Sequence, residues 1–414
     1  MTTAAQTAGV LSFEEAYQRV QDYCITIPKP AMERIGLTES LSRVLARQVK
    51  ADRDFPPFAR STRDGYAVRA LDTSSLPSSL RVIGQIKAGG TFDSTLQQSE
   101  AVEIMTGAAL PDGADAVAMV EHTRPLHGGM VQVERSVGTG ENVVPRGAEA
   151  RHGQELLQVG TRLGPAQIAM AAGAGCAELE VFRRARVAVL ATGDELVDVS
   201  ERPGPHQIRN SNSYSLAAQV AKAGGEPLIL PVAPDEEKKL EILVHAAMES
   251  ADMLLLSGGV SMGKFDLVEK VLSNLGAQFF FTGVQIQPGK PVVFGEIIYS
   301  RKQLPFFGLP GNPVSVMTTF DLFVRQVLAA LNGALPERLP VAQARLRKQV
   351  KTKTGLTRFL PAMLSGGLYD PQVELVPWQG SGDVLASSRA NCYLVVPPDR
   401  ESLEPGDMVS VLLR

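Results

Sequence analysis

Cysteine and histidine are scarce in this chain. Its 414 residues include five His and only three Cys, namely Cys24, Cys176 and Cys392. The cysteines lie far apart, form no CxxC pair and have no His at metal-ligand spacing, which argues against a zinc site. We interpret them as reduced thiols. Because reduced thiols suit a reducing compartment, we expect a cytoplasmic protein.

Targeting and membrane-spanning patterns are also missing. The first residues, Met1-Thr2-Thr3-Ala4-Ala5-Gln6, contain neither a basic nor an apolar run, so we expect no signal peptide. We find no stretch of roughly 18 apolar residues, the length that spans a bilayer. A formal net charge of -3 gives no general attraction to nucleic acid or anionic membrane. We therefore expect small-molecule substrates, with no nucleic-acid or membrane partner.

The chain is longer than one hydrophobic core can serve, so we expect several domains. Ser12 followed by Glu15 is a capping-box pattern and predicts a helix start. We expect a helical N-terminal domain formed by residues 1–51 and 150–182. Between them, residues 52–149 contain short apolar runs separated by Gly and Pro, which predicts an inserted β domain.

From residue 183 to 333, buried strands alternate with amphipathic helices, a pattern typical of a parallel sheet covered on both faces. After it, residues 334–414 return to short strands and turns, which predicts a C-terminal β domain. The fold class we expect is therefore multidomain, with α/β and β domains. The clearest strands are 187–190 and 253–256, and the clearest helices are 213–223, 235–248 and 314–331.

Polar segments directly follow the two clearest strands. The first strand leads into Thr192-Gly193-Asp194-Glu195, and the second into Ser257-Gly258-Gly259-Val260-Ser261-Met262-Gly263, which continues to Asp266. In a parallel sheet, ligands bind outside the carboxyl ends of the strands. Consecutive glycines let backbone amides approach a phosphate closely. We therefore predict an anion-binding site at this edge of the sheet.

Carboxylates beside such a site would repel an anion unless a divalent cation lay between them. Oxygen ligands suit Mg²⁺, and the candidates are Glu195, Asp235 and Asp266. A structural role is the alternative, because Asp235 precedes a helix and Asp266 stands three residues before Glu269, so both could be helix caps. For Asp235 both interpretations stay open. For Asp266 the long glycine loop before it favours function.

Two proline loops complete the α/β region. In Leu309-Pro310-Gly311-Asn312-Pro313, Asn312 and Pro313 suit the start of a helix, whose free amides could also face an anion. In Gln287-Pro288-Gly289-Lys290-Pro291, Lys290 places a positive charge on a turn. In the N-terminal half, Asp64 and Thr106 look locally like ordinary turn residues of a β domain.

Taken together, these loops resemble the molybdopterin molybdenumtransferases, the family that includes MoeA and the gephyrin E domain. The resemblance spans essentially the whole chain. Six segments match in order: Asp64-Gly65-Tyr66-Ala67-Val68, Thr106-Gly107, Thr192-Gly193-Asp194-Glu195-Leu196, Ser257-Gly258-Gly259-Val260-Ser261, Pro288-Gly289-Lys290-Pro291 and Leu309-Pro310-Gly311-Asn312-Pro313.

The resemblance implies a molybdopterin molybdotransferase that takes molybdopterin-AMP and molybdate, with Mg²⁺, and yields molybdenum cofactor and AMP. It implies an elongated homodimer, with the active cleft between the α/β domain of one subunit and the β insertion of the other. Contact with a molybdopterin adenylyltransferase is a further expectation. The family's functional residues fall on Asp64, Thr106, Glu195, Asp235 and Asp266, with Asp266 our first choice for the catalytic residue, and Ser381 matches a position in the last domain.

The chain departs from the family pattern where cations are expected. Many members carry a Lys before Pro-Gly-Lys-Pro, where this chain has Gln287, and Val144 stands in a run that usually ends in Arg. Lys290, Arg146 and Arg63 are hypothetical replacements.

Two other functions remain as alternatives. The first is a non-catalytic, gephyrin-like scaffold, against which the retention of Asp266 counts. The second is a molybdopterin adenylyltransferase, which shares the α/β domain but not the separate β domains.

Overall fold

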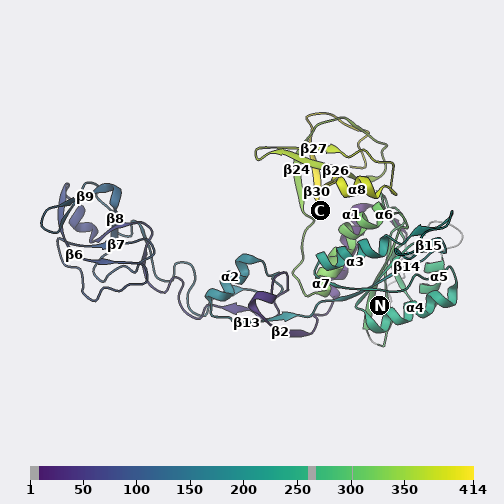
Figure 1. The fold of residues 1–414 in the computed structure, drawn as a ribbon, viewed down its shortest axis with the longest axis horizontal. Helices are drawn as coiled ribbons and strands as arrows, with labels where there is room; N and C mark the ends of the chain where they lie inside the picture. Colours follow the sequence, from purple (N-terminus) through teal and green to yellow (C-terminus); the bar gives the residue numbers. More distant parts are fainter. Residues whose placement is uncertain (1–8, 260–266, 301) are drawn as a thin grey trace, which may run out of the picture.

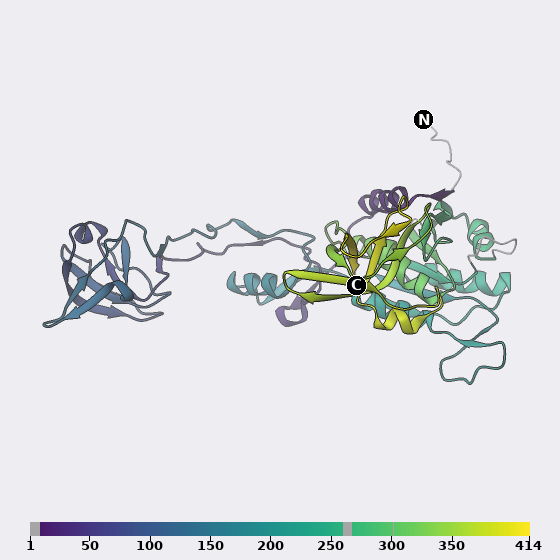
Figure 2. The ribbon, with the colours of Figure 1, turned by 90° about the horizontal axis from the view of Figure 1, so that it is seen from above.

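The computed structural model describes residues 9–259, 267–300 and 302–414. The molecule is elongated, with a compact body at one end and a separate β domain at the other (Figure 1). A thin arm of paired chain segments joins them, and it is extended in both views (Figure 2). All three cysteines are free, as expected.

A six-stranded sheet forms the centre of the compact body, in the order β17–β14–β18–β23–β22–β19. The predicted parallel arrangement holds for the first four strands, whereas β22 and β19 are antiparallel to their neighbours. The reason is local, because only two residues separate β22 from β23, and a parallel connection needs about a dozen. The bounds are β14 Arg186–Ala191, β17 Glu226–Ile229, β18 Met253–Ser257, β19 Gln278–Phe281, β22 Val293–Tyr299 and β23 Lys302–Leu309.

Helices cover both faces of this sheet. Val187 and Val189 pack with α1, α3, α6 and α7, whereas Ala188 and Leu190 pack with α4 and α5 on the opposite face, as expected from the alternation of side chains along a strand. The fold class predicted from the sequence is confirmed. The bounds are α1 Phe13–Thr26, α3 Asn212–Lys222, α4 Glu237–Ser250, α5 Leu267–Asn274, α6 Pro313–Thr319 and α7 Arg325–Leu331.

Helices α6 and α7 join through a π-helical segment, Phe320–Val324, into one long helix. Contrary to the expectation from the sequence, the stretch Pro313–Leu331 is long and apolar enough to cross a membrane, with a mean hydropathy of 1.4. However, 67% of it is buried inside the protein. A helix that is apolar all round belongs either in a protein core or in a membrane, and we interpret this one as a core helix.

The N-terminal region divides between two parts of the molecule. Helix α1 starts as predicted, because Glu15 N–H donates to Ser12 Oγ at 3.2 Å and Ser12 N–H donates to Glu15 Oε2 at 2.9 Å. It packs into the core of the α/β sheet, while the rest of the region forms two strand pairs, one α-helix and one short 3-10 helix around a smaller core. The domain limits inferred from the sequence remain a prediction. The bounds are β2 Met32–Gly36, β3 Val49–Lys50, β12 Glu155–Leu157, α2 Pro165–Gly173 and β13 Glu178–Phe182.

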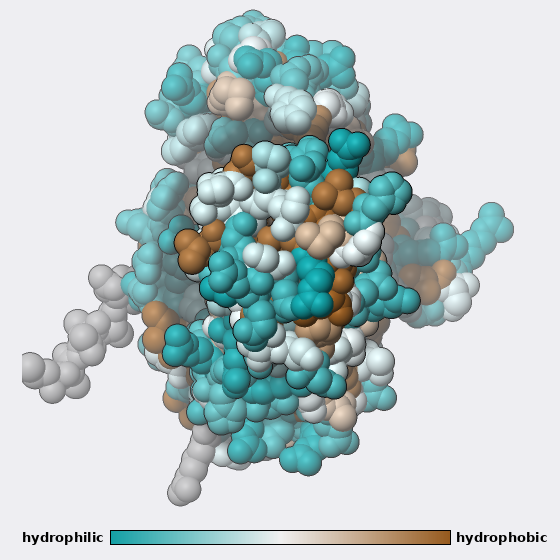
Figure 3. Space-filling view, turned by 90° about the vertical axis from the view of Figure 1, so that its left-hand side faces the viewer, coloured by the Kyte–Doolittle hydropathy of each residue, from teal (hydrophilic) through white to brown (hydrophobic). Residues whose placement is uncertain are grey.

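The β domain at the far end of the arm is a six-stranded sheet in the order β8–β5–β7–β6–β10–β9. Figure 3 views the molecule from this end, where apolar residues are scattered among hydrophilic ones. Leu71 and Val120 are among the exposed apolar side chains. The bounds are β5 Gly65–Val68, β6 Ser78–Ile86, β7 Glu100–Ile104, β8 Ala116–Met119, β9 Thr123–Leu126 and β10 Met130–Val133.

The C-terminal strands close into a barrel, because β26 pairs with both β27 and β28 in the order β26–β27–β24–β30–β28. Strand β21 (Ile286–Gln287) comes from the α/β region and adds to β26 in parallel, with Gln287 opposite Arg358. Backbone hydrogen bonds therefore tie the barrel to the compact body. The bounds are β24 Val341–Leu346, β26 Thr357–Gly367, β27 Asp370–Leu375, α8 Val384–Arg389, β28 Cys392–Val396 and β30 Met408–Leu413.

Gly295 in β22 tests how tightly the sheet packs against its neighbours. A Cβ at this position would lie 2.6 Å from the Phe306 ring and closer still to the carbonyl oxygen of Gln278. We expect Gly295→Ala to lower the free energy of unfolding by about 1–3 kcal/mol, the usual cost of overpacking. Gly367→Ala is the control, because nothing lies within 4 Å of its Cβ. Equal unfolding curves in urea for the two variants would contradict this prediction.

Candidate functional site

The segments that follow three neighbouring parallel strands meet at one edge of the sheet. Thr192 N–H donates to the carbonyl oxygen of Ser257 at 3.0 Å, and Gly258 N–H donates to that of Leu309 at 3.3 Å. The loop after β14 therefore contacts the loop after β18, which contacts the loop after β23. Three of the segments singled out in the sequence come together here, at the carboxyl ends where α/β sheets bind ligands.

Gly258 and Gly259 allow the second loop to pass directly over Thr192. Both have a positive φ, of 93° and 64°. A Cβ on Gly258 would lie 2.5 Å from the Thr192 carbonyl oxygen, and one on Gly259 would lie 2.9 Å from Thr192 Oγ1. Only glycine tolerates both the conformation and the close approach. The predicted residues Val260, Ser261, Gly263 and Asp266 lie outside the described residues.

Three carboxylates gather beside this crossing. The side chain of Glu195 folds back over Gly193, where a Cβ would collide with its carboxylate. Asp235 N–H donates to Asp194 Oδ1 at 3.1 Å. Burial raises the pKa of Asp235, and the negative charges of Asp194 and Glu195 raise it further. The N-cap of α4 is Glu236, so the helix-capping interpretation of Asp235 is wrong.

These carboxylates carry charge that no side chain in the described ranges balances. None of the three forms an ion pair with a Lys or Arg of the described residues. Like charges this close are unfavourable unless a cation or a proton joins them. Within residues 9–259, 267–300 and 302–414, no group of three metal-ligating side chains is complete enough to hold an ion. The Mg²⁺ site with Asp266 therefore stays a prediction.

Asn212 joins two of the loops and was missed in the sequence. Its Nδ2 donates to Ser257 Oγ at 2.9 Å and to the carbonyl oxygen of Gly311 at 2.8 Å. Its Oδ1 is buried and has no hydrogen-bond partner among the described residues, and the same holds for Thr192 Oγ1. Buried polar atoms are normally satisfied, so two such atoms at one crossing fit a site that a ligand completes. The prediction began this helix at residue 213, one residue too late to include Asn212.

The start of α6 contacts the C-terminal domain. Asn312 occupies the N-cap position and Pro313 the first helical position, as predicted, but the Asn312 side chain makes no capping bond. Val314 N–H donates to the carbonyl oxygen of Ser381 at 3.0 Å. One of the amides expected to be free is therefore occupied. The same bond brings Ser381 to the candidate site, where the sequence placed it only by resemblance.

A buried arginine stands beside the position where a lysine was expected. The loop from Gln287 to Pro291 lies against α6, because a Cβ on Gly289 would lie 2.5 Å from the Thr319 methyl group. Arg358 Nε donates to Gln287 Oε1 at 2.8 Å. The residue is only 6% exposed, and burial lowers the pKa of its guanidinium. No described carboxylate pairs with it, so its charge is available near the exposed Lys290.

Asp64 and Thr106 also come together, but elsewhere. Thr106 donates to Asp64 Oδ1 from its backbone N–H at 2.6 Å and from its Oγ1 at 2.8 Å. These two bonds lower the pKa of Asp64. The pair lies in the β domain, at the opposite end of the molecule from the α/β sheet (Figure 1). Arg146, a hypothetical replacement cation, is paired with Asp54 at 2.7 Å.

Comparison with known protein families covers nearly the whole chain. Residues 11–175 match the MoeA N-terminal region (domain I and II), and residues 343–413 match the MoeA C-terminal region (domain IV). Residues 188–330 match a probable molybdopterin binding domain. The chain belongs to the MoeA family. The resemblance drawn from the loops is therefore confirmed.

Individual MoeA proteins match over the same length. A molybdopterin molybdenumtransferase of Bacillus subtilis is 36% identical over 411 residues, which cover 97% of this chain and 93% of the relative. One of Nostoc is 35% identical, covering 92% of this chain and 88% of the relative. The crystal structure of a MoeA protein from Pyrococcus horikoshii superimposes with a TM-score of 0.78 at 30% identity, covering 98% of this chain and 100% of that one. The predicted enzyme class and the role in molybdenum cofactor biosynthesis agree with these names.

Asn212 offers a test of the connection between the loops in this MoeA chain. Asn212→Ala removes both donated bonds and leaves the Gly311 carbonyl oxygen without its partner. We expect the free energy of unfolding to fall by about 1–3 kcal/mol, the cost of an unmet polar group. The neighbouring Ser211→Ala is the control, because its side chain makes no capping bond. Chemical unfolding of both variants measures the difference, and equal stability would show that Asn212 does not hold the loops.

Proposed function

We propose that this MoeA-family chain is a molybdopterin molybdenumtransferase that inserts molybdate into molybdopterin-AMP and releases AMP. One observation carries the proposal. The loop Leu309–Pro313 is bonded to the glycine crossing at Leu309, and the helix that follows it is bonded to the Ser381 loop at Val314. The carboxylates lie beside the crossing. A substrate that carries both a phosphoanhydride and a metal-binding dithiolene needs these two kinds of surroundings.

The carboxylate side suits the phosphoanhydride. Mg²⁺ held by Glu195, Asp235 and Asp266 would neutralise charge on the anhydride oxygens. The Asp194 carboxylate accepts a hydrogen bond from the backbone N–H of Asp235. This bond keeps Asp194 and Asp235 together beside the glycine loop. Thr192 Oγ1 and Asn212 Oδ1, which are buried and have no partner in the described part of the chain, could accept hydrogen bonds from the substrate.

The cationic side suits molybdate. Arg358 is buried beside Gln287 and has no carboxylate partner among the described residues. Its Nε and Nη1 already donate to Gln287 Oε1 and to the carbonyl oxygen of Leu356, so it would offer an oxyanion its positive charge and its remaining N–H donors. Lys290, on the loop against α6, supplies a second positive charge, while Ser381 lies at the start of the same helix. We propose that these residues replace the cation that Gln287 removes.

Asp64 and Thr106 require a second subunit if they act in the same reaction. Within one chain they lie at the far end of the arm from Glu195 (Figure 1). We propose a homodimer in which the β domain of one subunit covers the α/β loops of the other. Exposed apolar side chains on that domain, such as Leu71 and Val120, are suited to a contact of this kind. We also propose a cytoplasmic location and contact with a molybdopterin adenylyltransferase.

Release of AMP tests the reaction directly. We expect the wild-type chain, given molybdopterin-AMP, molybdate and Mg²⁺, to release AMP, and chelation of Mg²⁺ to stop it. Glu195→Gln removes one proposed ligand and should slow release at least about tenfold, since a bound metal contributes several kcal/mol. Glu201→Gln, an exposed acid of the same domain, is the matched control.

Three results would contradict this assignment. Binding of molybdopterin-AMP without turnover would favour the scaffold alternative. Adenylylation of molybdopterin by ATP would favour the adenylyltransferase. Release of AMP at the wild-type rate by Asp266→Ala would remove Asp266 from its proposed role.

Mixing two variants that are each expected to be impaired tests the shared site. Asp64→Asn affects only the β domain, and Glu195→Gln only the α/β domain. If each site takes one residue from each subunit, a mixed dimer holds one intact site and one doubly altered site. We expect co-refolded variants to recover roughly a quarter of the wild-type rate, because about half of the dimers are mixed. No recovery, with mixed dimers shown by mass spectrometry, would place both residues outside a shared site.

A further inference from the structure

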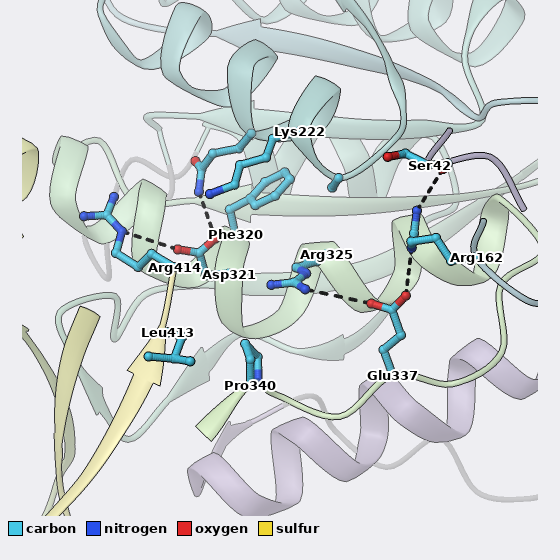
Figure 4. Close-up of a pocket in the computed structure, with 12 residues that line it drawn as sticks. Ser42, Arg162, Lys222, Phe320, Asp321, Arg325, Glu337, Pro340, Leu413 and Arg414 are labelled. Carbon is cyan, nitrogen blue, oxygen red and sulfur yellow. Dashed lines mark hydrogen bonds and ion pairs between the residues drawn. The ribbon is translucent and has the colours of Figure 1, made fainter. Parts of the chain in front are cut away.

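A second cavity lies away from the candidate site, where the C-terminal barrel meets the α/β sheet and the base of the arm. Its volume is about 410 Å³. Arg325 and Asp321 come from the long buried helix, Lys222 from the end of α3, Arg162 from the arm side and Arg414 from the C-terminus (Figure 4). No residue discussed for the molybdopterin reaction lines it.

Positive charge exceeds negative charge around this cavity. Four cationic side chains line it, namely Arg162, Lys222, Arg325 and Arg414, against two acids, Asp321 and Glu337. Arg162 makes a direct bond, with Nε 2.9 Å from Glu337 Oε1. The charge of Glu337 is therefore balanced mainly by Arg162, and the other three cations are not needed for it.

Lys222 and Arg325 have side-chain donors that no described residue uses, whereas Arg414 Nη1 already donates to the carbonyl oxygen of Ser387 at 2.9 Å. Arg325 approaches Glu337 only to 3.9 Å, and Arg414 approaches Asp321 only to 4.0 Å. Both distances exceed the range of a hydrogen bond. Lys222 has no carboxylate of the described chain within ion-pair distance. A ligand with several acceptor oxygens could therefore bind Lys222 and Arg325 without breaking a direct ion pair.

The rest of the lining is part polar, from Ser42 and Gln219, and part apolar. Phe320, Pro340 and Leu413 contribute carbon surface to the wall. The cavity also has the size of small-molecule sites, which run from roughly 300 to 1,000 Å³, and is larger than a bare tetrahedral anion needs. Guanidinium groups bind phosphate through paired donors. We propose that this cavity binds a small organic phosphomonoester, with its phosphate between Lys222 and Arg325.

The cavity is connected to the molybdopterin site through two helices. Helix α3 begins at Asn212, beside the glycine crossing, and its last residue is Lys222 in the cavity. The long helix begins at Pro313 and reaches the cavity at Phe320 and Asp321. Ten residues of helix span about 15 Å. A phosphomonoester here would hold the far end of α3 and the middle of the long helix without touching the substrate.

Titration calorimetry on the full-length chain tests the site. Ribose 5-phosphate is the probe, with inorganic phosphate and ribose for comparison. We expect ribose 5-phosphate to bind more tightly than inorganic phosphate, and ribose not to bind. Lys222→Gln and Arg325→Gln should each weaken ribose 5-phosphate about tenfold, the effect of one charge-assisted hydrogen bond. Lys87→Gln, an exposed lysine of the distant β domain, should bind as the wild type does.

Two outcomes would overturn the proposal. One is a dissociation constant within twofold of the Lys87→Gln control in both cavity variants. The other is inorganic phosphate binding as tightly as ribose 5-phosphate, which would leave no role for the organic part. Lys222→Gln breaks no ion pair of the described chain, so this variant is less prone to misfolding than Arg325→Gln. Circular dichroism verifies that both variants fold. Failure here would leave the AMP-release assay unaffected.

Discussion

Burial of the helix between Pro313 and Leu331 is the constraint on which the compact body depends. Its sides fill one face of the sheet and contact α1. Its first turn receives the Ser381 loop, and its π-helical segment faces the second cavity. A π turn shifts the residues after it around the helix axis, and such turns are frequent at functional sites. This one apolar helix contacts the sheet, the barrel and the arm. Moving any of these three parts would therefore expose apolar surface of the helix.

The sequence predicted what depends on local or periodic interactions. Ser12 and Glu15 predicted the start of α1 correctly, because the capping hydrogen bonds join residues within one helical turn. The convergence of Thr192 and Ser257 followed from a general property of parallel sheets, without knowledge of any contact. The first prediction used residues within one helical turn of each other, and the second used positions that the direction of the strands determines.

What the sequence did not predict depends on distant partners. Arg358 is 71 residues from Gln287, and nothing in its own surroundings in the chain marks it as the neighbour of that glutamine. Asn212 looks like an ordinary residue before a helix until Gly311, 99 residues away, is placed beside it. The reversed direction of β22 was missed because a strand buried on both faces has the same composition in either direction.

The joining of β21 to the barrel has a consequence for how the chain can vary. Along a strand, side chains point alternately to opposite faces, so a shift of one residue sends every side chain to the other face. Gln287 and Arg358 are register partners in this ladder. An insertion or deletion of one residue at the start of β26 would exchange Arg358 for Thr357 or Phe359 at that place. Loops elsewhere in the barrel can change length, but this junction fixes both the orientation of the barrel and the sign of the charge beside α6.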